Sequence, residues 1–195
     1  MIKWTEQVTT LQTCLQNIEI TNAAQLPQSP DDAFVALVAK IRELKTAHST
    51  AFFIGNGASA SMSSHMQADF AKNAQINTQT FTDLSLLTAI ANDMGYDNVY
   101  AYPLKNSGKK GDLLVAISSS GQSNNILQAV RMAKQLGMSV CTLSGMRVDN
   151  PLRMLGDINI YVPGDAYGLV ETAHATILHY WVDLIGQDVD ARRHA

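Results

Sequence analysis

The sequence predicts an α/β fold in which a five-stranded parallel sheet is flanked by helices on both faces and preceded by extra N-terminal helices. From residue 50 onward, short apolar runs alternate with longer helical segments, a pattern typical of a parallel sheet covered on both faces. The run 113–117 is apolar throughout, as expected of a strand buried on both sides. A chain of 195 residues is long enough for one domain with a sizeable core.

Two helices are predicted ahead of the sheet. Residues 2–19 place apolar side chains at mostly helical spacing, and a second helix begins at Asp31 and Asp32. Because both precede every predicted strand, they are expected to pack outside the sheet or against a partner subunit. We therefore expect a single domain, 1–195, in which an N-terminal helical pair for oligomer packing (1–47) precedes an α/β core (48–186).

Within the core, strands and helices are predicted in alternation, without a repeat, linker or low-complexity stretch. The predicted strands are 51–54, 77–81, 113–117, 139–143 and 158–162. The predicted helices are 59–73, 84–92, 123–136, 149–155 and 167–186.

Composition excludes several classes of protein. The formal net charge is −3 and no basic stripe is present, which argues against nucleic acid as a ligand. No segment approaches the ~20 apolar residues needed to span a membrane, and the N-terminus lacks the apolar core of a signal peptide. Cys14 and Cys141 lie far apart and are interpreted as reduced thiols. A cytoplasmic protein is therefore expected.

Two hydroxyl-rich loops, each following an apolar strand, are the most informative local feature. The first reads Gly55-Asn56-Gly57-Ala58-Ser59-Ala60-Ser61, and the second reads Ser118-Ser119-Ser120-Gly121-Gln122-Ser123. Each is expected to end in a helix, so that backbone N–H groups and serine hydroxyls face one point, an arrangement that suits a phosphate. Ligands of open α/β sheets bind beyond the carboxyl ends of the strands, where both loops lie.

Two other interpretations of the first loop stay open. Residues 55–60 also fit the dinucleotide pattern G-x-G-x-x-A, which needs an acidic residue ~20 positions on. The first acid after the second strand is Asp83, 28 positions past Gly55, and no G-K-[ST] follows. A glycine-serine turn that serves only chain reversal is the other possibility. The hydroxyl content of the second loop favours the phosphate site.

Four titratable residues form a candidate chemical site. His65 and Asp69 are spaced i,i+4 on one helix face. Glu171 and His179 are spaced i,i+8, about 12 Å along a helix, and converge only by leaning toward each other over Ala175. Two imidazoles and two carboxylates suit a site for zinc or for another divalent cation, and they also suit an acid/base pair. The alternative is that these residues lie on a solvated helix face without a chemical role.

Two further groups have ordinary structural interpretations. His174 is expected to be a packed or surface histidine. Asn92 and Asp93 precede Gly95, as at a normal helix terminus, although an aspartate pointing into the site would bind sugar hydroxyls.

Taken together, these motifs resemble the SIS (sugar isomerase) domain family and, within it, the bacterial phosphoheptose isomerases, over residues 35–186. Residues 55–60 followed by His65 resemble G-N-G-G-S-A and its histidine, and residues 83–93 resemble D-x-S-x-L-T-A-I-x-N-D. Residues 117–125 resemble I-S-T-S-G-N-S-x-N. Glu171, His174 and His179 have the spacing of Q-x-x-H-x-x-x-x-H.

The resemblance implies a flavodoxin- or Rossmann-like three-layer sandwich, assembled as a homotetramer, that isomerises sedoheptulose 7-phosphate to the aldose, glycero-manno-heptose 7-phosphate. It implies zinc bound by His65, Asp69, Glu171 and His179, with Asp69 as catalytic base and His179 as acid. The implied substrate-binding residues are Asn56, Gly57, Ser59, Asp93, Ser118, Ser119, Ser120, Ser123 and Glu171.

This chain departs from the family pattern at three places. Asp69 replaces a glutamate, which retracts the carboxylate by ~1.5 Å, and a displacement near 1 Å can cost ~100-fold in rate. Glu171 replaces a glutamine, which adds a negative charge that tightens a cation. A basic stretch after the glutamate is reduced here to Lys72. The substrate is then another sugar phosphate, or another subunit supplies the cation.

Two non-catalytic interpretations stand beside the isomerase. One is a phosphosugar-sensing module. The other is a binding platform of the kind found among SIS proteins that bind the bacterial replication initiator, a class without the second histidine of the last motif. The presence of His179 favours the enzyme.

Overall fold

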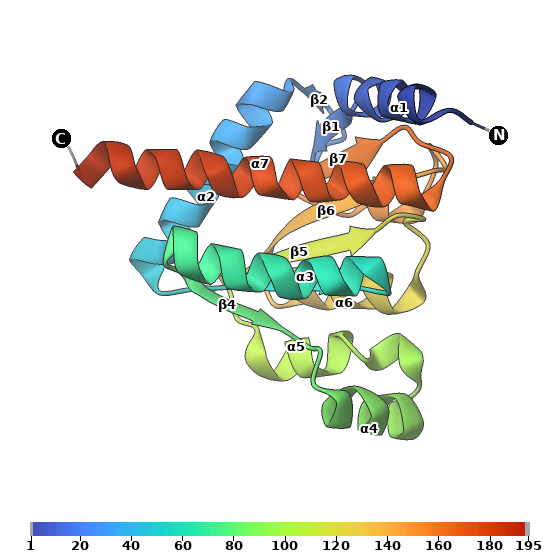
Figure 1. The fold of residues 1–195 in the computed structure, drawn as a ribbon. Helices are drawn as coiled ribbons and strands as arrows, with labels where there is room; N and C mark the ends of the chain where they lie inside the picture. The colour runs from blue at the N-terminus through green and yellow to red at the C-terminus, as the bar shows by residue number, and fades with distance from the viewer. Residues whose placement is uncertain (1, 194–195) are drawn as a thin grey trace.

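A computed structural model describes residues 2–193, with side chains described through residue 187, as an α/β fold around one seven-stranded sheet (Figure 1). The sheet order is β2-β1-β7-β6-β5-β3-β4. The strands are β1 (Glu19–Asn22), β2 (Pro27–Gln28), β3 (Thr50–Gly55), β4 (Asn77–Thr80), β5 (Leu113–Ser118), β6 (Ser139–Gly145) and β7 (Ile158–Val162). The helices are α1 (Trp4–Gln16), α2 (Pro30–Ala47), α3 (Ala58–Asp69), α4 (Leu84–Met94), α5 (Ala101–Ser107), α6 (Asn124–Gln135) and α7 (Tyr167–Arg193).

The five predicted strands β3 to β7 are confirmed, and they pair in parallel. The predicted strand number is wrong, because a hairpin of β1 and β2 extends the sheet, with β1 antiparallel to β7. The N-terminal region is thus helix, hairpin and helix rather than a helical pair. Ile18 and Ile20 alternate with polar residues, the period of a strand, and Ile20 is buried opposite Ile160.

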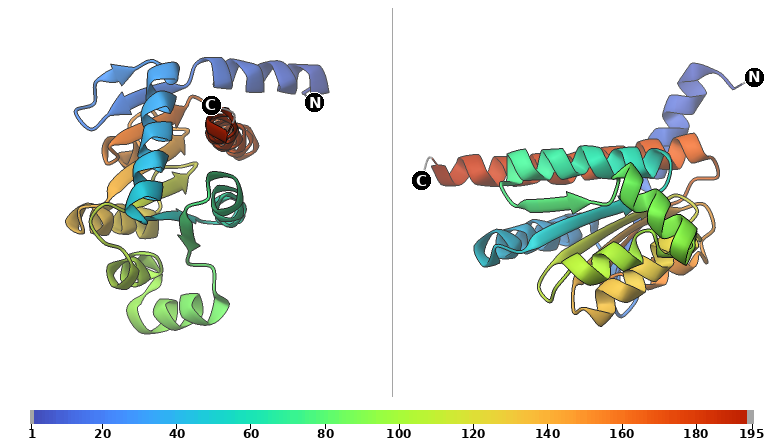
Figure 2. Two further views of the ribbon diagram at one scale, coloured as in Figure 1. Left: turned by 90° about the vertical axis from the view of Figure 1, so that its left-hand side faces the viewer. Right: turned by 90° about the horizontal axis from the view of Figure 1, so that it is seen from below.

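Helices cover the sheet on both faces, as predicted. Along β3, Phe53 packs with α2, α3 and α7, whereas Phe52 and Ile54 pack with α5 and α6. The left view of Figure 2 shows α3 and α7 on one side of the sheet and α5 and α6 on the other. Helix α5 was not predicted, and α7 continues beyond the predicted end at residue 186. Because side chains alternate between faces, each central strand contributes to both cores.

The parallel strands have the order β4-β3-β5-β6-β7. From β3 the chain first forms β4 on one side of β3, and then crosses over to form β5 on the other side of β3. The point where this order reverses lies between β3 and β5. In doubly wound sheets, ligands bind beyond the carboxyl ends of the strands at this switch point. Both hydroxyl-rich loops follow these two strands, so the topology brings them together.

Helices α3 and α7 lie side by side on one face and run in the same direction (Figure 1). After Asp69, α3 passes into a π-helical turn, Phe70–Ala74. The ring of Phe70 lies 5.0 Å from that of Phe53 and 4.9 Å from that of Trp181, measured between centroids. This aromatic cluster is buried, and it fixes the end of α3 against the middle of α7.

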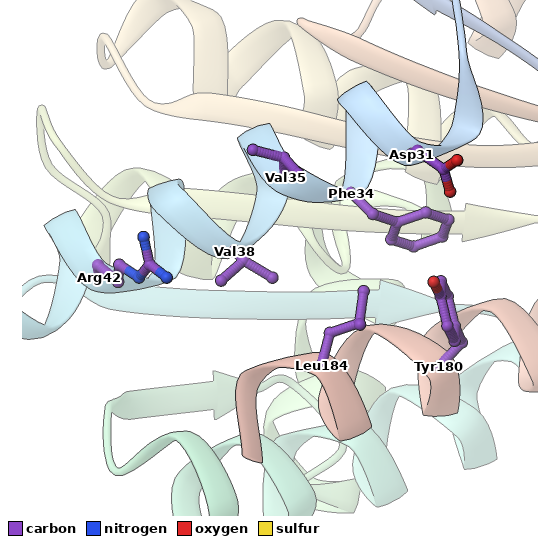
Figure 3. A pocket seen from close by; sticks show the side chains of 7 residues that line it. All are labelled: Asp31, Phe34, Val35, Val38, Arg42, Tyr180 and Leu184. Carbon is purple, nitrogen blue, oxygen red and sulfur yellow. The ribbon is translucent and has the colours of Figure 1, made fainter. Parts of the chain in front are cut away.

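A groove of about 280 Å³ lies between α2 and α7, on the outside of the molecule (Figure 3). Val35 is 70% exposed and Tyr180 is 45% exposed, so apolar surface faces solvent here. The lining residues are Asp31, Phe34, Val35, Val38, Arg42, Tyr180 and Leu184. Within the described part of the chain, no helix has the length and apolarity that crossing a membrane requires.

Replacing Phe70 by alanine is expected to destabilise the fold by about 3–5 kcal/mol, because the removed ring leaves a cavity between the sheet and α7. The measurement is urea unfolding followed by circular dichroism. Leu84→Ala is the control, since Leu84 is 74% exposed and should change the free energy of unfolding by less than about 0.5 kcal/mol. Equal effects of the two substitutions would contradict the role given to the aromatic cluster.

Candidate active site

A cavity of about 260 Å³ lies between the two hydroxyl-rich loops and the start of α7. It is polar at its base, where serines of both loops meet. Its lining residues are Asn56, Gly57, Ala58, Ser59, Ser118, Ser119, Ser120, Ser123, Tyr167 and Glu171. Glu171 and seven other predicted substrate-binding residues thus face one space. Tyr167 was not among the predicted residues. The one sequence signal that could have suggested it is its position at the start of the last helix.

The first loop is held in place by a pair of asparagines. The Asn56 amide donates to Asn125 Oδ1 at 2.9 Å, and the Asn125 amide donates to Asn56 Oδ1 at 2.8 Å. The Tyr96 hydroxyl also donates to Asn56 Oδ1, at 3.2 Å. The buried Tyr100 hydroxyl donates to the carbonyl of Gly55, and burial raises the pKa of this phenol to about 12. Asn56 therefore joins the first loop to the start of α6, and its predicted contact with the sugar stays a prediction.

The second loop packs on the side chain of the buried Asn150, and the Leu152 N–H donates to the carbonyl of Gly121 at 3.1 Å. The Asn150 amide donates to Ser144 Oγ at 3.3 Å and to the Gly145 carbonyl at 3.2 Å. Gly121 has a φ of +63°, and a Cβ built there would lie 2.0 Å from Asn150 Oδ1. Since an L side chain is strained at this φ and has no room, the serine loop requires glycine at this point.

Both loops direct helix N-termini at the cavity. Helix α3 begins at Ala58 after Gly57, whose φ is +56°, and α6 begins at Asn124 after Ser123. Unpaired backbone N–H groups at such termini attract anions. Ser119 Oγ is buried without a hydrogen-bond partner, so the loop offers a free hydroxyl for a ligand.

The charge on the lining is unusual for an anion site. Among the side chains that the structure describes, no lysine or arginine lines the cavity. Lys72, the residue left of the expected basic stretch, is exposed on the π-helical turn. Within one chain, the groups that face this cavity and suit a phosphate are hydroxyls, backbone N–H groups and helix N-termini.

A second space of about 270 Å³ adjoins the first and shares Ala58, Ser59 and Glu171 with it. It lies between α3, α7 and the end of β5. Met62, Ile117, Thr172, His174 and Ala175 complete the lining. His174, expected to be a packed or surface histidine, is buried and lines this space.

The His174 ring is fixed by one contact. Its Nε2 lies 3.1 Å from the carbonyl oxygen of Ser144, and its Nδ1 is buried with no partner. Burial lowers the pKa of His174 to about 4, although the contact with Ser144 acts to raise it. The ring is therefore neutral at pH 7.

Three of the four predicted metal ligands meet further along the two helices. His65, Asp69 and His179 place one ligand atom each within 4.8 Å of one another. His65 Nε2 lies 3.4 Å, and His179 Nδ1 3.9 Å, from Asp69 Oδ2. The two imidazole rings are 5.1 Å apart between centroids. His65 and Asp69 are neighbours on α3, and the contact of Phe70 with Trp181, two residues after His179, holds α7 beside this end of α3.

This cluster fits zinc by its chemistry. Two imidazole nitrogens and a carboxylate oxygen are donors that Zn²⁺ accepts, and catalytic zinc sites use three protein ligands with a further position open. Glu171 lies outside the cluster and lines the two cavities instead. Its predicted metal contact stays a prediction.

Asp93 does not line either space. It lies exposed on α4, where its Oδ1 accepts a hydrogen bond from the Asn92 amide at 2.8 Å. The predicted sugar contact of Asp93 has no support in the fold of a single chain.

The cavity and the cluster are separated along α3 and α7. With a rise of 1.5 Å per residue, Ser59 and His65 are about 9 Å apart along α3, and Glu171 and His179 are about 12 Å apart along α7. Because the helices run in the same direction, both distances describe one path from the serine loops to the cluster.

Comparison with known proteins gives consistent results. Residues 16–145 match the family model of the SIS domain. Phosphoheptose isomerase of Akkermansia muciniphila is 33% identical over 143 residues, which cover 70% of this chain and 75% of that protein. Phosphoheptose isomerase of Helicobacter pylori is 37% identical over 137 residues, covering 67% and 71%. The structure of phosphoheptose isomerase from Neisseria gonorrhoeae superposes with a TM-score of 0.79 at 26% identity, over 94% of this chain and 95% of that chain.

The buried neutral state of His174 predicts a loss of stability in mild acid. The unfolded histidine has a pKa near 6.5 and the folded one about 4, so protons bind the unfolded chain first as the pH falls. The free energy of unfolding should therefore fall between these values, by about 2 kcal/mol from about pH 7.5 to about pH 5. Urea unfolding at several pH values measures this, and His174→Gln should lack that part of the slope. The same slope in both proteins would contradict a neutral buried imidazole.

Proposed function

This chain belongs to the SIS domain family and is a phosphosugar isomerase related to the phosphoheptose isomerases, and from this premise we propose that it interconverts sedoheptulose 7-phosphate and the aldose glycero-manno-heptose 7-phosphate. The observation that supports this substrate is the distance between the serine cavity and the cluster of His65, Asp69 and His179. About 9–12 Å along the helices matches a phosphate at one end of an extended sugar and a carbonyl at the other.

The serine cavity binds the phosphate in this proposal. Ser59, Ser118, Ser120 and Ser123 donate hydroxyl hydrogens, and Ser119 Oγ has no competing partner within the protein. The N-termini of α3 and α6 add their partial positive charge. Binding energy from the phosphate, remote from the reacting carbons, then holds the carbonyl end against the cluster.

Asp69 and His179 carry the proton transfers. The Asp69 carboxylate removes a proton from C1 of the ketose while His179 gives a proton to the C2 oxygen, which yields an enediol. The proton on Asp69 then returns to C2, and His179, which has given up its proton, takes the proton of the C1 oxygen as the aldehyde forms. Positioned groups of this kind contribute about 10²- to 10⁴-fold each. The 3.9 Å between Asp69 Oδ2 and His179 Nδ1 supports a shared role.

His65, Asp69 and His179 would hold a zinc ion, with Glu171 as the further ligand that the family pattern implies. A bound divalent ion polarises a carbonyl oxygen and stabilises negative charge that develops on it. The shorter side chain of Asp69 is offset by the close approach of α3 and α7, which already brings its carboxylate to both histidines.

A reducing cytoplasm is the proposed location. Cys14 in α1 and Cys141 in β6 are both buried and free. Burial raises the pKa of the Cys141 thiol to about 12, which keeps it protonated and unreactive.

The proposal also includes a homotetramer, in which copies of the chain cover the groove between α2 and α7. The exposed apolar side chains of Val35 and Tyr180 support an interface there, because apolar surface of this kind is commonly buried by a partner (Figure 3). This fits the expectation that the N-terminal segment packs between subunits.

Incubation of the protein with sedoheptulose 7-phosphate and zinc should produce the aldose. Asp69→Asn should lower kcat by about 10²- to 10⁴-fold, because an amide cannot accept the proton from C1, while binding of the sugar phosphate persists. Asp149→Asn is the matched control, because the Asp149 side chain is exposed and pairs with Arg147, and it lines neither cavity. Aldose formation is followed by chromatography, and binding by calorimetry.

Two results would contradict this assignment. An active Asp69→Asn variant would remove Asp69 from the role of base. A wild-type protein that binds sedoheptulose 7-phosphate without converting it, with and without zinc, would indicate a phosphosugar-sensing protein instead.

Light scattering tests the assembly. A homotetramer has a mass of four times 21.2 kDa, about 85 kDa. Val35→Asp should shift the protein to smaller species, because it places a charge in the groove. Val148→Asp is the control: Val148 is 64% exposed and lies outside the groove, so this substitution should leave the mass of the assembly unchanged. A monomeric wild-type protein would refute the tetramer.

A further inference from the structure

The imidazole of His174 is a buried polar group that the proposed proton transfers do not use. It lies on α7 between the two ends of the site, one turn after Glu171 and five residues before His179. It lines the space of about 270 Å³ that adjoins the serine cavity. Along the axis of α7, His174 thus lies between Glu171 of the serine cavity and His179 of the cluster.

The hydrogen bond at one ring nitrogen determines what the other can do. A backbone carbonyl only accepts hydrogen bonds, so the contact between Nε2 and the Ser144 oxygen places the ring hydrogen on Nε2. Nδ1 is then a lone-pair acceptor. It is buried and has no partner within the protein, a state that costs stability unless a donor occupies the neighbouring space.

Because the ring is buried, Nδ1 stays an unprotonated acceptor across the physiological pH range. The pKa of His174 is lowered to about 4, chiefly by desolvation, so Nδ1 does not take up a proton near neutral pH. The surrounding lining is mixed, with apolar side chains from Met62 and Ile117 beside Ser59 and Glu171. A ligand hydroxyl is a donor of the right kind for such a place, since it is neutral and small.

We propose that Nδ1 of His174 accepts a hydrogen bond from a mid-chain hydroxyl of the sugar phosphate, which makes His174 a specificity-determining residue. This inference rests on the proposed function only because it requires a sugar phosphate, with its several hydroxyl groups, to bind in the site. Inorganic phosphate, which occupies the serine cavity alone, makes no contact with His174. The residue therefore discriminates among sugar phosphates by the hydroxyl they present between phosphate and carbonyl.

Two substitutions separate this role from a structural one. In His174→Gln the amide nitrogen reaches the position of Nε2, so the bond to Ser144 is kept while the acceptor at Nδ1 is lost. In His174→Asn the side-chain oxygen reaches the position of Nδ1, so the acceptor is kept while the bond to Ser144 is lost. Calorimetry measures the affinity of each variant for sedoheptulose 7-phosphate and for inorganic phosphate.

We expect His174→Gln to lower the affinity for sedoheptulose 7-phosphate by about tenfold, the effect of one neutral hydrogen bond. The affinity for inorganic phosphate should change by less than about twofold. His174→Asn should restore most of the affinity for the sugar phosphate. Equal losses for both ligands would show that His174 only shapes the serine loop, and no loss for either would also overturn the proposal.

A measurement on the wild-type protein does not depend on how the variants fold. The ¹⁵N resonance of His174 Nδ1 should move toward the hydrogen-bonded range when sedoheptulose 7-phosphate is added and stay in place with inorganic phosphate. An unchanged resonance with bound sugar phosphate overturns the inference but not the isomerase. Binding and a shifted resonance without turnover overturn the isomerase alone, and absence of binding overturns both.

Discussion

The packing of α3 against α7 is the constraint on which the site depends. Residues from these helices that are more than 100 positions apart in the sequence meet only because both helices cross the same face of the sheet in the same direction. Phe70 secures this arrangement, since its ring contacts Phe53 below and Trp181 beside it. The π-helical turn that starts there follows directly after Asp69, whose carboxylate oxygen Oδ2 lies within 3.9 Å of both histidines.

The sheet topology supplies the other half of the site. The strand order reverses between β3 and β5, so two loops from separate parts of the chain form one cavity. Polar contacts then fix each loop to the body of the protein: Asn56 to Asn125, and the Gly121 carbonyl to the Leu152 N–H. Because these contacts form without a ligand, the backbone of both loops is held in place beforehand, as preorganised binding requires.

The parts predicted well from the sequence are those encoded by neighbouring residues. A glycine-serine run after an apolar strand identified both loops, and the spacing of His65 and Asp69 placed them on one helix face. The β1–β2 hairpin was missed because its strand alternation, Ile18 and Ile20, is too short to stand out directly after the helical spacing of residues 2–19, and pairing with β7 decides its structure. Likewise, no local signal tells that His174 lines a cavity or that Glu171 lines the serine cavity instead of joining the cluster; packing across the sheet determines both.

If the serine cavity binds the phosphate as proposed, its lack of lysine and arginine among the described residues of one chain has a kinetic consequence. An isomerase makes a product that carries the same phosphate as its substrate, so every favourable phosphate contact also slows departure. Dipoles and hydroxyls orient the group closely, yet they add little long-range attraction of the kind that fixed cations exert. Such a cavity favours correct placement over tight retention, and it leaves catalytic turnover less limited by escape of the product.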